Sequence, residues 1–168
     1  MKILIPTAKE MNLSLKPHGK CFLSEQTKTI VASLSQYSIE ELAHFYYIDL
    51  ERAEEEYVHF QQLKNGQALT YPALHLFDGL MYRNIKRSDL TEKKSRYVDK
   101  HLFITSSLYG VMPAMALISP HRLDFSVKCT ISGKSLKNYW RNDYDAAISD
   151  EEMILSLLSS EFETVFSK

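Results

Sequence analysis

Short apolar runs alternate with amphipathic segments along this chain. Residues 3–5 and 102–105 are apolar runs of strand length. Residues 153–158 form a longer apolar run between acidic residues and serines, which predicts a buried strand. Residues 122–128 alternate apolar and polar positions and predict a further strand. Strands interspersed with helices in this way indicate an α/β fold, with α+β as the alternative.

The first half of the chain predicts three helices in succession. Residues 29–34 form the first, and the second should begin at Ser38, because Ser38 and Glu41 have the spacing of a capping box. Asp49 is a suitable N-cap for the third and longest helix, which Asn65 and the glycine after it should end. The second and third helices therefore make a helical hairpin with a short connection.

The second half predicts three more helices. Residues 86–100 favour a basic amphipathic helix, residues 136–140 a short helix that 144–148 would extend, and residues 163–168 a last one. No repeat, low-complexity tract or linker divides the chain. We therefore predict a single domain over residues 1–168, a mixed sheet flanked by helices, with the helical hairpin in its N-terminal region.

Composition narrows the class of protein without naming a function. The 168 residues are 45% hydrophobic and 24% charged with a net charge of −1, which is typical of a globular protein and shows no overall basic excess. Cys21 and Cys129 lack metal-ligand spacing and favour free thiols in a reducing compartment. The N-terminal apolar run is too short for a signal peptide, and no run approaches the roughly 18 residues of a membrane span. We expect a cytoplasmic protein without a membrane partner.

Polar residues that follow the predicted strands are the candidates for a binding site. Strand ends gather at one edge of an α/β sheet, where clefts form. These residues are Lys9, Ser106, Ser107, Arg122, Ser159 and Glu161. Lys9 and Arg122 suit the binding of an anion or carboxylate, with Ser159 beside them and Asp78 or Asp124 to orient them.

Two of these residues have alternative roles. Lys9 would act as a base or nucleophile if it were buried, because burial favours the neutral amine. Arg122 would be a structural partner if it paired with Asp124 or Glu161. The residue pattern alone leaves both alternatives open.

Metal and phosphate motifs are absent from the sequence. The six histidines have no HxH or HExxH spacing, and neither a Gly-rich phosphate loop nor a G-x-S-x-G elbow occurs. The sequence therefore predicts no metal site and indicates no cofactor.

Nucleic-acid binding has two candidate features. Lys86, Arg87, Lys93 and Lys94 lie in the most basic stretch, although acidic residues are interspersed and a solvated helix face has the same pattern. The connection at residues 46–49 has the length of a helix-hairpin-helix connection. It lacks the glycine whose N–H approaches phosphate in such motifs, so an ordinary αα-hairpin is the alternative.

Blocks spread over the whole chain resemble the YaaA peroxide stress family. They are MKILIPTAKEM, YPALHLFDGLMYRNI, ITSSLYGVMPAMALISPHRLDF, LKNYW and LLSSEF, in the family's order. The positions that match the family's motifs give the candidates for catalysis, which are Lys9, Asp78, Ser106, Tyr109, Arg122 and Glu161.

The resemblance also shows departures. Ser107, His121 and Asp124 stand where the family usually has Gly, Tyr and Glu, and residues 113–116 replace an Arg-Pro-x-Asp motif. Family members continue further, so this chain is expected to lack the family's C-terminal third.

The resemblance implies a cytoplasmic oxidative stress protein that helps to limit free intracellular iron and to protect DNA. It implies binding of double-stranded or branched DNA through a helix-hairpin-helix and a basic cleft. The alternative is an enzyme acting on a small anionic or nucleobase-like substrate in a cleft of Lys, Asp, Arg and Glu residues. A third hypothesis, direct iron sequestration, is disfavoured because no ligand cluster is visible. Whether the protein is an enzyme is left open.

Overall fold

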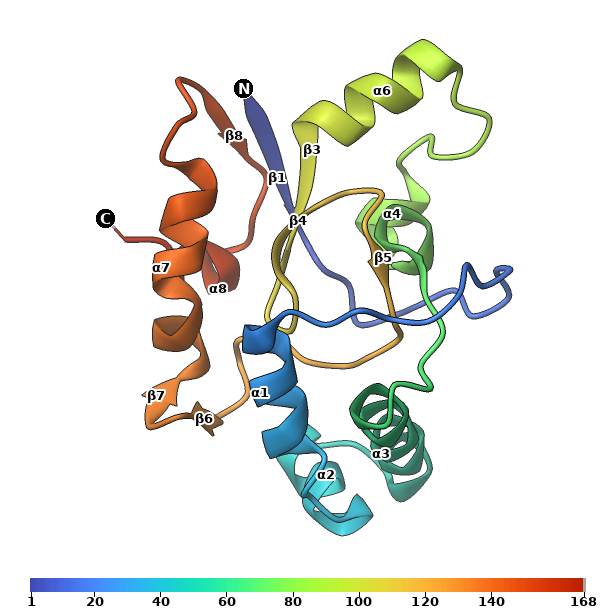
Figure 1. Ribbon diagram of the computed structural model, residues 1–168, viewed down its shortest axis with the longest axis vertical. Coiled ribbons are helices and arrows are strands. Elements are labelled where there is room, and N and C mark those ends of the chain that lie inside the picture. Colours follow the sequence, from blue (N-terminus) through green and yellow to red (C-terminus); the bar gives the residue numbers. More distant parts are fainter. Residues whose placement is uncertain (168) are drawn as a thin grey trace.

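A four-stranded sheet runs through the middle of the computed structural model, which describes residues 1–167 (Figure 1). The strands are ordered β4-β3-β1-β8, with bounds Gly110–Pro113, Leu102–Ser106, Lys2–Pro6 and Ile154–Ser156. β1 runs parallel to β3 and β8, whereas β4 is antiparallel to β3. The predicted mixed sheet flanked by helices is therefore confirmed.

Helices and two short strand pairs accompany this sheet. The helices are α1 (Glu25–Leu34), α2 (Ile39–Tyr46), α3 (Leu50–Lys64), α4 (Ala73–Leu76), α5 (Leu80–Arg83), α6 (Glu92–His101), α7 (Leu136–Ile148) and α8 (Ser160–Glu163). The strand pairs are β2 (Tyr71–Pro72) with β5 (Leu117–Ile118), and β6 (Thr130–Ile131) with β7 (Lys134–Ser135). None of the helices among residues 1–167 has the length and apolar character that crossing a membrane requires.

The helices divide between the faces and one end of the sheet. α7 lies on one face, where Lys2 Nζ of β1 donates to the Ala147 carbonyl at 2.5 Å. On the other face, Ile5, Ile104 and Met112 pack into one apolar cluster with α4. α1, α2 and α3 stand together at one end of the molecule, and the larger apolar core joins them to α7 (Figure 1). The loops that leave β1 and β3 therefore meet this helical unit.

The hairpin helices begin and end where the sequence predicts. Ser38 Oγ accepts from the Glu41 N–H at 3.2 Å, and the Glu41 carboxylate accepts from the Ser38 N–H at 2.7 Å, which completes the capping box. Asp49 caps α3 by accepting from the Arg52 N–H at 2.9 Å, and Asn65 ends that helix. These local hydrogen bonds fix the geometry of the connection between α2 and α3.

Replacing Ser38 by alanine is expected to lower the free energy of unfolding by about 1 kcal/mol. The Glu41 N–H would lose its acceptor at the first turn of α2. Urea denaturation measures the change, with Ser88→Ala, an exposed serine outside the helices, as the control. Equal stabilities for the two variants would contradict the capping argument.

Residues 122–128 form a loop, so the predicted strand is wrong. The backbone N–H groups bond to side-chain carboxylates in place of a strand ladder. The Arg122 N–H donates to Glu56 and the Phe125 N–H donates to Glu161, both at 2.7 Å. The apolar alternation does not reflect alternate burial, because Asp124 is buried together with Leu123 and Phe125 while Arg122 is only partly buried.

The last third of the chain differs in two further respects. β8 is a strand as predicted, but it is exposed rather than buried, because only β1 lies beside it. The final helix ends at Glu163, whereas the sequence predicts helix over 163–168. Residue 168 lies outside the described residues. An apolar run predicts a strand but does not show how many neighbours that strand has.

Candidate ligand-binding site

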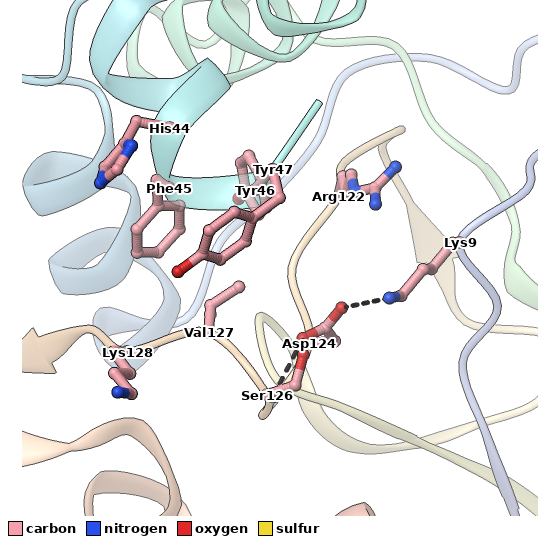
Figure 2. Close-up of a pocket in the computed structure, with 10 residues that line it drawn as sticks. All are labelled: Lys9, His44, Phe45, Tyr46, Tyr47, Arg122, Asp124, Ser126, Val127 and Lys128. Carbon is pink, nitrogen blue, oxygen red and sulfur yellow. Dashed lines mark hydrogen bonds and ion pairs between the residues drawn. The ribbon is translucent and has the colours of Figure 1, made fainter. Parts of the chain in front are cut away.

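A cleft opens between the α2–α3 connection, the loop after β1 and residues 122–128 (Figure 2). Its main hollow has a volume of about 560 Å³, and two smaller hollows adjoin it. Lys9 and Arg122 line all three, and we call the whole the Lys9 cleft. The main hollow alone has the size of a small-molecule site.

Aromatic side chains from the α2–α3 connection form one wall of the cleft. Tyr46 is the last residue of α2, and Tyr47 caps the helix in the left-handed conformation with φ of 54°, which is uncommon for a residue with a side chain. The Tyr47 side chain is 87% exposed, so its ring is open to stack on a ligand. The N–H groups of Tyr47 and Ile48 donate to the Ala43 carbonyl and are used within the hairpin.

Arg122 presents its guanidinium to this wall. Its guanidinium lies 5.8 Å from the centre of the Tyr46 ring, a cation–π distance. Arg122 Nε and the Tyr46 hydroxyl are buried and have no hydrogen-bond partner among residues 1–167. Burial raises the pKa of Tyr46 well above its ordinary value, so the hydroxyl stays protonated as a donor. Neither atom is exposed to solvent, so a ligand would bond to them only after the cleft wall adjusts, and each buried donor would then gain from its partner.

The predicted structural partners of Arg122 are engaged elsewhere. Asp124 forms an ion pair with Lys9 at 3.2 Å (Figure 2), and Glu161 accepts from the Phe125 N–H. Burial raises the pKa of Asp124, but hydrogen bonds from Ser126 and the contact with Lys9 outweigh it, so the pKa lies below its ordinary value. Asp124 is thus an anion that holds Lys9 at the mouth of the cleft.

Replacing Lys9 by methionine is expected to raise the pKa of Asp124 towards its ordinary value. The variant removes the cation that favours the charged carboxylate and leaves the Ser126 hydrogen bonds in place. Carboxyl-carbon NMR titration of Asp124 measures the change. Lys93→Met on α6 is the matched control, and an unchanged Asp124 titration in Lys9→Met would contradict the assignment.

Ser159 and Glu161 line the smaller hollow beside Lys9 and Arg122. Ser159 caps the short helix α8 through its backbone position without a side-chain cap bond, so its hydroxyl is exposed beside the cleft. The structure therefore brings together five of the residues proposed from the sequence, which are Lys9, Arg122, Asp124, Ser159 and Glu161. Lys9 is 59% exposed and does not have the buried environment that a base or nucleophile role assumed.

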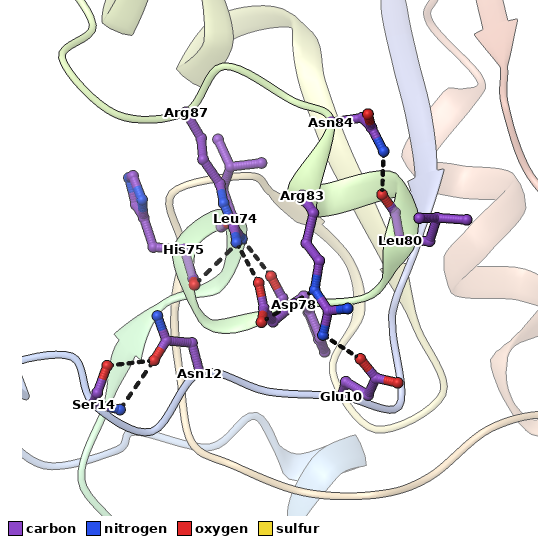
Figure 3. A network of polar contacts seen from close by, with 11 residues as sticks. Glu10, Asn12, Ser14, Leu74, His75, Asp78, Leu80, Arg83, Asn84 and Arg87 are labelled. Atoms are coloured by element: carbon purple, nitrogen blue, oxygen red, sulfur yellow. Dashed lines mark hydrogen bonds and ion pairs between the residues drawn. The ribbon is translucent and has the colours of Figure 1, made fainter.

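Asp78 serves the loop that carries Lys9 and does not line the cleft. Its carboxylate pairs with Arg87 at 2.7 Å (Figure 3), and its N–H donates to the Glu10 carbonyl at 2.8 Å. The next residue, Gly79, approaches Ala8 so closely that an added Cβ would lie 2.8 Å from the Ala8 Cβ. The FDG segment thus fixes the backbone on either side of Lys9.

Ser106, which is buried, and Tyr109, which is partly buried, also lie outside the cleft. Ser106 Oγ accepts from the N–H groups of Leu108 and Tyr109 at 3.1 Å each, and the Tyr109 hydroxyl accepts from the Ser119 N–H. Burial raises the pKa of Tyr109 far above its ordinary value. These two residues shape the turn after β3 rather than face solvent.

The four basic residues proposed for nucleic acid do not share a face with the hairpin. α6, which carries Lys93 and Lys94, lies at the opposite end of the molecule from α2 and α3 (Figure 1). Arg87 donates to the carbonyls of Leu74 and Phe77, so it is tied into the loop near α4 (Figure 3). Lys86 is exposed.

Sequence reasoning missed the other wall of the cleft. Tyr46, Tyr47, Ser126 and Lys128 line the main hollow, yet none of them is a candidate from sequence. The Tyr-Tyr pair at a helix end beside a short connection is the one local signal, since exposed aromatic residues mark binding surfaces. Their meeting with residues 122–128 depends on contacts distant in sequence. Among residues 1–167, no group of three His, Cys, Asp or Glu side chains is arranged to hold a metal ion.

The fold and the cleft define a mixed α/β protein with a cleft whose main hollow is lined by basic and aromatic side chains. A family model described as "Peroxide stress protein YaaA" matches residues 1–168, and the chain belongs to this family. A "UPF0246 protein" of Streptococcus gordonii strain Challis is 58% identical over all 168 residues, which make up 69% of that relative. A "UPF0246 protein" of Streptococcus pneumoniae serotype 19F is 54% identical with the same coverage.

Proposed function

We propose that this peroxide stress protein binds a small anionic molecule with a planar, nucleobase-like ring in the Lys9 cleft. The observation that carries the proposal is Arg122, a cation without an ion pair among residues 1–167, set against Tyr46 and beside Lys9. The anion would lie between the two cations, and the ring would stack on the exposed Tyr47.

Nucleoside monophosphates are suitable probes because they combine a phosphate with a planar base. We expect AMP to bind more tightly than adenosine or inorganic phosphate alone when each is titrated by calorimetry. Arg122→Met should weaken AMP binding by about ten- to hundredfold, the effect of losing a charge-assisted hydrogen bond. Lys93→Met should bind as the wild type does. Failure of all three probes to bind, or equal binding by Arg122→Met, would contradict the proposal.

The enzyme alternative concerns the same cleft. Asp124 lines the main hollow and Glu161 the smaller hollow beside it, and both already accept hydrogen bonds from the protein. Glu10, Glu55 and Glu56 line the third hollow. A catalytic protein would convert a bound probe, which chromatography of the incubated nucleotide detects. Loss of turnover in Glu161→Gln with AMP binding retained would assign a catalytic role, whereas an unaltered nucleotide would favour a binding protein.

DNA binding is the second candidate function, because the α2–α3 hairpin forms a wall of the main hollow, which Lys9, Arg122 and Lys128 also line. A branched DNA duplex would then contact Lys9, Arg122 and Lys128 together. The affinity should fall as salt rises, and Lys128→Met should reduce the salt slope by about one. Absence of salt-dependent binding would exclude this candidate.

The cellular role that fits either function is to limit free iron and protect DNA during peroxide stress in the cytoplasm. The family description supports the peroxide stress response. The remainder is our proposal. Free intracellular iron and DNA breaks after peroxide treatment, compared between cells with wild-type protein and Arg122→Met, test it directly.

A further inference from the structure

The outer edge of the main sheet is uncovered. β8 pairs with β1 on one side only, and among the residues that the structure describes no strand lies on its other side. An open strand edge offers unpaired backbone groups to another polypeptide. Soluble proteins usually blunt such an edge or cover it.

One face of β8 is also apolar and exposed. Side chains alternate along a strand, and the hydrogen bonds to β1 continue at the Met153 carbonyl and the Leu157 N–H, so Met153, Leu155 and Leu157 lie on the same face. They are 61%, 47% and 53% exposed, respectively. Leu155 lies beside Ile3 in the sheet, so its side chain is on the same face as Ile3 and Ile5. On this face α4 packs over Ile5 and Ile104 and does not cover the stripe. Three neighbouring apolar side chains in water mark a binding surface.

Acidic residues border this stripe. Asp150 and Glu152 precede it and are exposed, whereas Glu163 accepts from Ser156 Oγ at 2.8 Å and so lies towards the opposite face of β8. A partner that buries the apolar stripe would therefore present Lys or Arg at its rim, because opposite charges steer association and fix its orientation.

The length of the relatives identifies a partner. The Streptococcus gordonii relative is 58% identical over the matched part, yet that part is only 69% of its length. The remaining 31% of that relative has no counterpart among these 168 residues. We propose that the face formed by Met153, Leu155 and Leu157 binds the polypeptide that makes up this remaining part of the relatives, through a strand added to β8. The proposal concerns which polypeptide binds this face. It makes no statement on whether that polypeptide belongs to the same chain.

A second copy of this chain is a weaker candidate for the same face. β8 has only three residues in strand conformation, so pairing β8 with itself across a two-fold axis would bury few side chains. The acidic border would also meet its own like charges across that axis.

The test is a titration of the 168-residue chain with the unmatched polypeptide of the Streptococcus gordonii relative, made separately. We expect saturable binding and new protection of the β8 amides from hydrogen exchange. Leu155→Asp should weaken binding about tenfold or more, because it places a charge in the apolar contact. Phe22→Asp, at an exposed apolar residue near α1, is the control and should bind normally.

Three outcomes would overturn the proposal. They are an absence of binding, binding that Leu155→Asp does not weaken, and sedimentation that shows a dimer of the chain that Leu155→Asp dissociates. If Leu155→Asp fails to fold, as judged by circular dichroism, Leu157→Ser takes its place at the neighbouring position. Nucleotide binding in the Lys9 cleft is measured on the same samples, so failure here is separable from failure of the proposed function.

Discussion

Replacing Trp140 by alanine is expected to lower the free energy of unfolding by about 3–5 kcal/mol. The Trp140 side chain is 3% exposed, and its indole N–H donates to the Ser107 carbonyl at 2.6 Å. Its ring also lies against Gly110, where an added Cβ would come within 2.9 Å. Alanine would leave a cavity and an unpaired buried carbonyl at once.

Urea denaturation at low temperature measures this loss, since it is a large share of the stability of an ordinary domain. Trp140→Phe should cost less, because it keeps most of the ring contact and loses only the hydrogen bond. Phe22→Ala, at a side chain that is 96% exposed, should leave the midpoint unchanged. A Trp140→Ala variant as stable as Phe22→Ala would contradict the packing that we describe.

The same contact matters for the cleft. The turn that Trp140 holds includes Ser107, whose hydroxyl donates to the Leu123 carbonyl at 2.6 Å. Leu123 lies between Arg122 and Asp124, so the turn fixes both residues in the cleft. Trp140 is thus a positioning residue for the proposed ligand site. Trp140→Phe removes the indole hydrogen bond to Ser107 and should retain AMP binding if the ring contact alone holds the turn.

The helices were predictable from sequence because their signals are local. Ser38, Glu41 and Asp49 satisfy N–H groups three residues away, and such bonds do not depend on the rest of the chain. The exposure of β8 and the loop conformation of residues 122–128 were not predictable, because segments distant in sequence determine whether a strand is buried and which groups a loop bonds to. Glu56 and Glu161 replace a neighbouring strand at Arg122 and Phe125, and no pattern in the loop itself indicates them.

The candidate site residues also divide into those whose position could be predicted from the sequence and those whose position could not. Lys9, Arg122, Ser159 and Glu161 follow strands or the loops between them and do meet, as the strand-end argument predicts. Asp78, Ser106 and Tyr109 come from equally polar motifs but hold the backbone that carries Lys9 and Arg122. Sequence shows that such residues are polar. Only packing shows whether a side chain faces the cleft or supports the segments around it.

Lowering the pH is expected to destabilise this protein through His121. The side chain is 3% exposed, and Nδ1, which lies 2.9 Å from the Ser119 carbonyl, must donate to it. Burial lowers the pKa of His121 from 6.5 to about 4, although the Ser119 hydrogen bond and the nearby Glu56 favour the charged form. The folded protein therefore excludes a proton that the unfolded chain binds.

The sign of the effect follows from this difference. Between pH 6.5 and about 4 the unfolded chain binds more protons at His121, so stability rises with pH across that window. The contribution is complete above pH 6.5 and amounts to about 3 kcal/mol, most of which is lost by about pH 5.

His121→Asn keeps a donor for Ser119 and cannot be protonated. Urea denaturation at several pH values should therefore show a shallower fall for His121→Asn than for the wild type. His18→Asn, at an exposed histidine, should follow the wild type, and an equally steep fall in His121→Asn would show that other groups cause the acid sensitivity.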